Sequence, residues 1–336
     1  MSEKSILMKP KRQIAFVADL NKCIGCQNCT VACKKSWTRN IGQDYMYWRN
    51  VETNPGMGYP KNWAKNGGGF VDGKVVKAEK GRSLGDYGVP FEFDYHGRLF
   101  EGKKGRAKPS PAARWAPNWE DDQGAGDYPN NYYFYVPRMC NHCDNPACLI
   151  ACPNDAIYKR SEDGLVVVHD DLCKGAQDCV SACPYAKTYY NDRTAKANKC
   201  IGCYPRVEKG TAPACVAQCN GRAMHVGFLD DPMSSVNQLV KKWKVALPLY
   251  ADKGTGPNAF YIPPFLGPVM EDGAGKLGTE PKIPMSVLEE MFGDDVKMAL
   301  KVLQSEREKK MSSGDSQLMD LLIGSRSADM MLDPLT

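Results

Sequence analysis

Short apolar runs beside polar, cysteine-containing loops are the first pattern along the sequence. The run at 12–20, RQIAFVADL, leads into Cys23, and the run at 222–228, RAMHVGF, leaves Cys219. Both are short and rich in apolar residues, which is typical of β-strands. We therefore expect one strand before the first cysteine loop and another after the last.

The sequence AIYKRSEDGLVVVHDDLC predicts a β-hairpin in the middle of the chain. A short strand begins at Ile157, Asp-Gly at 163–164 makes the turn, and 165–168 form the return strand. A looser version, TYY followed by the polar turn NDRT, precedes Cys200. A strand, a cysteine loop and a helix are therefore expected to recur four times.

Residues 34–139 have a different character, with little helical periodicity and many Gly, Pro and aromatic residues. A loop insertion of this length is unusual unless it is functional or packs on a partner. We expect a segment that wraps over the cysteine loops and buries its tryptophans on another subunit; the alternative is a surface loop without such a role. The tryptophans are Trp37, Trp48, Trp63, Trp115 and Trp119.

The region after Phe228 is expected to be mostly helical. Helices are predicted for SSVNQLVKKWKVAL and for 285–311, where acidic residues come early and EREKK comes late, as the helix dipole favours. The second helix has a periodic apolar face formed by Val287, Leu288, Met291, Val296, Leu300 and Leu303.

Composition excludes several classes of protein. The 336 residues carry a net charge of only +5, with basic and acidic residues interleaved, so a nucleic-acid partner is not expected. No apolar stretch approaches the length of a membrane span, and no secretory signal is expected at the N-terminus. The sequence also lacks any constellation of residues for substrate chemistry, so catalysis is expected to belong to a partner.

Fifteen cysteines lie in four separate arrays. The first array, CIGCQNCTVAC, has the spacing of bacterial ferredoxins, in which three cysteines of a loop hold one iron–sulfur cluster and the fourth binds a second cluster. Disulfides do not fit such crowded spacing or an odd count, and a structural zinc site leaves the remaining cysteines unexplained. In the third array, CKGAQDCVSACP, Ala176 replaces the second cysteine.

Position along the chain predicts how the arrays pair. A single hairpin separates the second and third arrays, so these should share one two-cluster module, which leaves the first and fourth arrays to form another. Crossed ligation then predicts three [4Fe-4S] clusters and one [3Fe-4S] cluster at the three-cysteine site beside Ala176. The predicted sets are Cys23, Cys26, Cys29 and Cys219; Cys33, Cys200, Cys203 and Cys215; Cys140, Cys143, Cys148 and Cys183; and, for [3Fe-4S], Cys152, Cys173 and Cys179.

Two histidines and one aspartate lie near these arrays. His142 lies within the second array and His225 follows the fourth; both are expected to pack or form hydrogen bonds near the clusters rather than bind iron. Asp178 is the only nearby substitute for the missing thiolate and is expected to point away. The predicted fold is α+β, with ferredoxin-like modules at 12–33 plus 193–228 and at 140–192, the insertion at 34–139, and the tail at 229–336.

The four arrays in this order, together with MYWRNVETNPGMGYPKNW, NHCDNPACL and KKWKVALPL, resemble the iron–sulfur beta subunits of membrane nitrate reductase and its periplasmic relatives. Those relatives include perchlorate, chlorate and selenate reductases, dimethylsulfide dehydrogenase and ethylbenzene dehydrogenase. GRAMHVGF and SADMMLDPLT most resemble the perchlorate reductase branch. Nitrate reductase beta subunits are larger and carry tryptophan at the position of Ala176, so the chain departs from them there.

The resemblance implies an electron-transfer subunit beside a catalytic alpha subunit, which alone carries the molybdopterin cofactor. Electrons would pass between that subunit and a cytochrome c or a haem-binding gamma subunit. The first-array cluster would lie nearest the catalytic subunit and the three-iron cluster at the far end. A periplasmic location after co-export with the catalytic subunit is expected, rather than a cytoplasmic one. The alternatives are the same role in a dehydrogenase or in a selenate or nitrate reductase and, more distantly, a zinc-organised scaffold.

Overall fold

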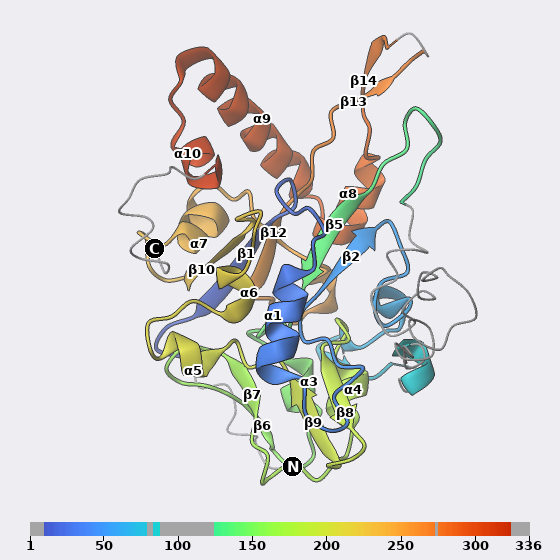
Figure 1. Ribbon diagram of the computed structural model, residues 1–336, viewed down its shortest axis with the longest axis vertical. Coiled ribbons are helices and arrows are strands. Elements are labelled where there is room, and N and C mark those ends of the chain that lie inside the picture. The colour runs from blue at the N-terminus through green and yellow to red at the C-terminus, as the bar shows by residue number, and fades with distance from the viewer. Residues whose placement is uncertain (1–9, 79–82, 88–123, 273–274, 324–336) are drawn as a thin grey trace, which may run out of the picture.

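The computed structural model describes residues 10–78, 83–87, 124–272 and 275–323 (Figure 1). These residues form an α+β fold of one four-stranded sheet, five two-stranded sheets and short helices. Trp115, Trp119 and the segment SADMMLDPLT lie outside the described residues.

The largest sheet joins the two ends of the predicted cysteine region. Its order is β10-β1-β12-β11, with β1 (Ile14–Asp19), β10 (Met224–Phe228), β11 (Leu247–Pro248) and β12 (Ala259–Ile262). The strands predicted before the first array and after the fourth are confirmed, and they pair antiparallel with each other. This pairing brings the first and fourth cysteine loops to the same end of the sheet.

Both predicted hairpins are present. The first consists of β6 (Ile157–Lys159) and β7 (Val166–Val168), and the second of β8 (Thr188–Asn191) and β9 (Lys196–Lys199). Each hairpin delivers the chain into the next cysteine loop, as the sequence predicts. Both lie at the end of the molecule opposite the long tail helix (Figure 1).

Short helices follow the cysteine loops. They are α1 (Asn28–Trp37), α3 (Ala147–Ile150), α4 (Asp178–Ala182), α5 (Tyr204–Val207) and α6 (Ala214–Ala217). Helix α1 packs against α6, and α3 packs against α4. The helices of the first and fourth arrays are therefore neighbours, as are those of the second and third.

The insertion packs against the rest of this chain more extensively than expected. Its strand β2 (Asn50–Asn54) pairs with β5 (Phe134–Arg138) at its far end. Trp48 and Trp63 are buried within this chain, so the expectation that they pack on a partner is wrong for these two residues. The other described elements of the insertion are η1 (Trp63–Lys65), β3 (Gly69–Val71), β4 (Lys74–Val76) and η2 (Leu84–Tyr87).

The tail is helical at its end but also contributes strands β11 and β12 to the main sheet, which the sequence pattern did not reveal. The helix expected over 285–311 is divided at Gly293, where φ is +77°. No described helix combines the length and apolar composition needed to cross a bilayer. The remaining tail elements are α7 (Ser235–Asn237), the π-helix η3 (Gln238–Lys242), η4 (Ala251–Lys253), β13 (Pro268–Met270), β14 (Leu277–Pro281), α8 (Met285–Phe292), α9 (Val296–Ser313) and α10 (Gln317–Ile323).

Candidate iron–sulfur site

Four cavities are lined by cysteine side chains, and all fifteen cysteines are free thiols that line one of them. We name the cavities A to D. Cavity A is lined by Cys23, Cys26, Cys29 and Cys219; cavity B by Cys33, Cys200, Cys203 and Cys215; cavity C by Cys140, Cys143, Cys148 and Cys183; and cavity D by Cys152, Cys173 and Cys179.

The structure thus brings together the cysteines of each set grouped from the sequence. Cavities A and B draw on the first and fourth arrays, and cavities C and D on the second and third. Three or four thiols around one space are the donor set that an iron–sulfur cluster requires. Among the described residues, no group of three Cys, His, Asp or Glu side chains is arranged to hold a single metal ion.

The short helices explain why neighbouring cavities come in pairs. On α1, Cys29 lines cavity A and Cys33, one helical turn later, lines cavity B. Four residues of α-helix rise about 6 Å, so the two cavities lie close together along this helix. The same spacing of four residues recurs in the other arrays: Cys215 and Cys219 divide between B and A, Cys148 and Cys152 between C and D, and Cys179 and Cys183 between D and C.

The third cysteine loop has the same backbone pattern as the first. Gly25 and Gly175 occupy equivalent positions with φ of +68° and +75°, and Gln27 and Gln177 follow with φ of +59° and +64°. Left-handed conformations at these positions turn the chain sharply around the cavity. Ala176 lines cavity D at the position where the first loop has its second cysteine. The loop is therefore conformationally intact and lacks only the thiol.

Asp178 also lines cavity D, but its carboxylate is engaged elsewhere. Its Oδ1 lies 2.8 Å from Nζ of Lys77, which belongs to the insertion. The ion pair competes with any role of the carboxylate as a replacement ligand. It also places Lys77 of the insertion beside the third array.

Burial makes several of the thiols poor acids in the metal-free chain. Desolvation raises the pKa of Cys23 to about 11 and that of Cys179 to about 12. Iron must therefore displace protons from these sulfurs, so its binding is coupled to proton release.

Backbone amides approach the sulfurs in a repeated way. The amides of Ala156, Lys187 and Ala223 each donate to the sulfur of the cysteine four residues earlier, at 3.3–3.5 Å. Nε1 of Trp37, on α1, donates to Sγ of Cys203 at 3.1 Å. Hydrogen bonds to cluster sulfurs are one of the factors that set reduction potential. The arrangement therefore supplies both ligands and means of adjusting a bound cluster.

The two histidines have structural positions. Nδ1 of His142 accepts a hydrogen bond from the amide of Val166 at 3.0 Å, and burial lowers the pKa of His142 well below its usual value. His225 lies on β10 opposite Val17, and burial lowers its pKa to about 4. Both imidazoles are therefore neutral near pH 7, and neither lines any of the four cavities described here.

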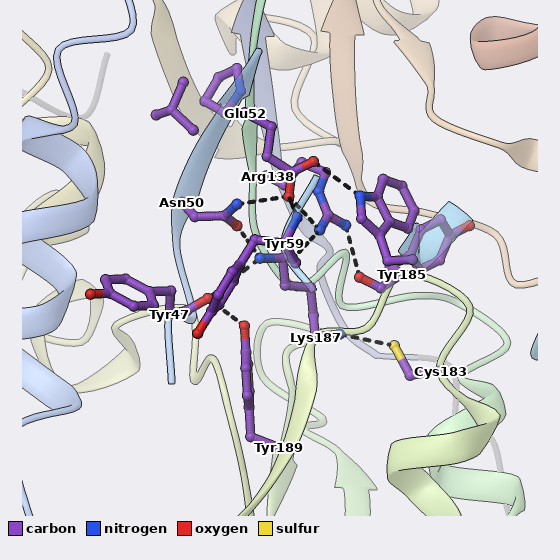
Figure 2. Close-up of polar contacts among 12 residues, drawn as sticks. Tyr47, Asn50, Glu52, Tyr59, Arg138, Cys183, Tyr185, Lys187 and Tyr189 are labelled. Carbon is purple, nitrogen blue, oxygen red and sulfur yellow. Dashed lines mark hydrogen bonds and ion pairs between the residues drawn. The ribbon is translucent and has the colours of Figure 1, made fainter. Parts of the chain in front are cut away.

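A buried polar network connects the insertion to cavity C (Figure 2). Glu52 on β2 accepts from Nη2 of Arg138 at 2.7 Å and from Nε1 of Trp63 at 3.0 Å. Burial opposes the charge of Glu52, but Arg138 lowers its pKa overall. Asn50 connects this pair to Nζ of the buried Lys187, which lines cavity C.

The network holds β2 and β5 against residues 185–187, which follow the third array. Sequence reasoning missed it because its members are far apart along the chain. The residues engaged in the wider network are Tyr47, Asn50, Glu52, Tyr59, Trp63, Arg138, Tyr185, Lys187 and Tyr189.

Comparison with known proteins finds an iron–sulfur domain and several similar beta subunits. A family model described as a 4Fe-4S dicluster domain matches residues 131–229, which include the second, third and fourth arrays. The chain is 64% identical to perchlorate reductase subunit beta of Dechloromonas aromatica, with 99% of each chain covered. It is 53% identical to selenate reductase subunit beta of Thauera selenatis and 50% identical to dimethylsulfide dehydrogenase subunit beta of Rhodovulum sulfidophilum, each over 95% of this chain and 98% of the relative.

Proposed function

Because the chain belongs to the family of iron–sulfur beta subunits of molybdenum oxidoreductases, we propose that it relays electrons between an external haem protein and a molybdopterin-containing catalytic subunit. The partner's reaction is proposed to be reduction of perchlorate or chlorate in anaerobic respiration, since the similarity to perchlorate reductase subunit beta extends over the full length. The observation that carries the proposal is the set of four cysteine-lined cavities, arranged as two adjoining pairs.

The cysteines of cavities A, B and C are proposed to hold one [4Fe-4S] cluster each, and those of cavity D one [3Fe-4S] cluster. When bound, such clusters carry electrons one at a time at potentials set by cluster type, hydrogen bonding and exposure. The assignment of cavity D is supported by Ala176, which lines it without offering a donor atom, and by the ion pair that engages Asp178.

Two ferredoxin-like modules are proposed on the same grounds. One comprises 12–33 and 193–228 with cavities A and B; the other comprises 140–192 with cavities C and D. Helix packing supports this division, since α1 packs on α6 and α3 packs on α4. Met139 lines cavity B and the next residue, Cys140, lines cavity C, which supports the order A, B, C, D.

The two ends of this order are proposed to face different partners. At cavity A, Cys26 is exposed, and Ile24 and Val31 expose 63% and 52% of their surface. Exposed apolar residues around a cofactor site fit a protein interface, and here we place the catalytic subunit. At cavity D, Ala176 and Leu172 are exposed, and here we place the cytochrome c or haem-binding gamma subunit. A periplasmic location after co-export with the catalytic subunit is part of the proposal.

The test is to purify the chain in complex with its catalytic subunit and measure iron, acid-labile sulfide and the EPR spectrum. We expect one iron for each of the fifteen cysteines, nearly equal sulfide, and one three-iron signal after oxidation in air. Zinc without sulfide would contradict the proposal. Assays with perchlorate and a reduced dye, and with dimethylsulfide and an oxidised dye, separate a reductase from a dehydrogenase.

A further inference from the structure

Two buried basic side chains lie between neighbouring cavities, and neither forms an ion pair with a carboxylate within the described part of the chain. They are Arg49 and Lys199, each with only 2% of its surface exposed. An unpaired buried charge is strongly unfavourable unless something nearby compensates it. By contrast, the equally buried Arg138 is paired with Glu52. The positions of Arg49 and Lys199 therefore require an explanation.

Arg49 immediately precedes β2 and lines cavities A and B simultaneously. Its Nη2 donates to Sδ of Met224 at 2.9 Å, and Met224 also lines cavity A. Its Nε is fully buried, and no described residue accepts a hydrogen bond from it. Arg49 therefore shares one cavity with Cys29 and the other with Cys215.

Lys199 ends β9 and occupies the next junction, between cavities B and C. Its Nζ donates to the carbonyl of Val166, which lines cavity C, and to that of Cys200, which lines cavity B, at 3.1 Å in the second case. Its ammonium group therefore lies between a residue that lines cavity B and one that lines cavity C.

We propose that Arg49 and Lys199 are charge-balancing residues, each shared by the two clusters on either side of it: Arg49 by A and B, and Lys199 by B and C. This inference rests on the proposed function. A fixed positive charge favours the form of a neighbouring cluster that carries one more electron. Each cation therefore raises the reduction potential of both its neighbours.

Sharing has a specific consequence for electron flow. A cation placed between two clusters makes both easier to reduce while leaving the difference between them nearly unchanged. The charge of Arg49 therefore leaves the difference in reduction potential between clusters A and B nearly unchanged. The charge of Lys199 does the same for clusters B and C. Among the described residues, none of the side chains lining cavity D is an equally buried cation. Clusters C and D therefore share no cation that would shift their two reduction potentials together.

The test uses the complex with the catalytic subunit carrying Arg49→Gln or Lys199→Met, and follows each cluster by EPR during a redox titration. We expect a roughly tenfold fall in the reduced-to-oxidised ratio at fixed potential, about 59 mV for a one-electron couple. Two four-iron centres should shift in each variant, one centre should shift in both, and the three-iron centre in neither. Arg160→Gln is the matched control, since it removes a cation that pairs with Asp163 and Glu208 and lines none of the four cavities.

Different results identify different failures. If the wild-type complex lacks iron–sulfur signals, the proposed function is wrong. If all four signals are present but the two variants leave every potential unchanged, or shift a single centre each, the inference is wrong. If Arg49→Gln prevents loading of A and B, then Arg49→Lys should restore both and the neutral Arg49→Met should restore neither. Equal restoration by Met would show a purely steric role and overturn the inference.

Discussion

Replacing Ala176 by cysteine is the change that most directly tests how cavity D is built. The third loop already has the backbone of the first, with left-handed residues at 175 and 177 where the first loop has them at 25 and 27. Ala176 lines the cavity, so Ala176→Cys is expected to add a thiol at the open corner without changing the loop. We expect the three-iron cluster to become a four-iron cluster.

The size of the effect follows from this placement. One added thiolate holds one more iron, so the content should rise from fifteen to sixteen irons per chain. The fourth thiolate adds one negative charge, but the fourth iron brings positive charge with it, so the net charge of the cluster and its ligands changes little. The reduction potential of this centre should therefore fall because the cluster type changes, by at least about 59 mV, which is a tenfold change in the reduced-to-oxidised ratio at fixed potential.

The assay compares iron content, EPR spectrum and activity of wild-type and variant complexes prepared side by side. The three-iron signal of the air-oxidised protein should disappear, and electron transfer with the cytochrome should slow. Activity with an artificial donor that enters near the catalytic subunit should change much less. Leu172→Cys is the control, because it adds an exposed thiol near Cys173 that does not line cavity D.

The reasoning is refuted if the variant binds sixteen irons but keeps the three-iron signal. It is also refuted if the oxidised wild type is EPR-silent with sixteen irons, because cavity D would then already hold a four-iron cluster with a ligand other than thiolate.

Three further predictions concern ligation and stability. Cys33→Ala should remove the cluster of cavity B and spare that of cavity A, despite its place in the first array; EPR that shows the reverse would contradict the crossed ligation. Glu52→Gln should lower the free energy of unfolding by roughly 3–5 kcal/mol at pH 7, because it leaves Arg138 buried without a partner. Folding lowers the pKa of Glu52, so the stability that its charge contributes is present above the unfolded value near 4.5 and is lost as pH falls through the folded value. In urea unfolding, the difference in free energy of unfolding between wild type and Glu52→Gln should therefore narrow in acid. His225 has a pKa of about 4 against about 6.5 when unfolded, so stability should fall as pH drops from 6.5 to 4. His225→Gln should flatten that part of the profile in urea unfolding, and an unchanged slope would count against a buried neutral imidazole.

The sequence predicts much of this architecture because its strongest signals are local. Strands β1 and β10 are apolar runs next to cysteine loops, and Asp163-Gly164 predicts the turn of the hairpin β6–β7. The cysteine spacings, the positions of the arrays along the chain and the crossed ligation of ferredoxins together group the thiols into the sets that line common cavities in the structure.

Features that depend on distant contacts gave no such signal. Strand β12 joins β1 from more than 240 residues away, and nothing in its own four residues indicates that neighbour. A single arginine at 49 looks like any surface residue until the fold buries it between two cavities. Trp48 and Trp63 looked like partner contacts because an aromatic-rich insertion has the composition of an interface. The break at Gly293 was the one miss with a local signal, since glycine commonly ends helices.

Each cysteine array supplies ligands to two cavities, and this sets the order in which the cavities can receive iron during synthesis. The ribosome finishes cavities C and D within about 45 residues of the first of their cysteines, a matter of roughly 2–9 s at 5–20 residues per second. The first array must wait for Cys219, roughly 190 residues after Cys33, which takes about 10–40 s. During that interval the four thiols of the first array are present on the nascent chain before the cysteines of the fourth array have been made. Iron delivery to A and B can therefore begin only after Cys219 has been made, whereas C and D can be filled earlier in synthesis.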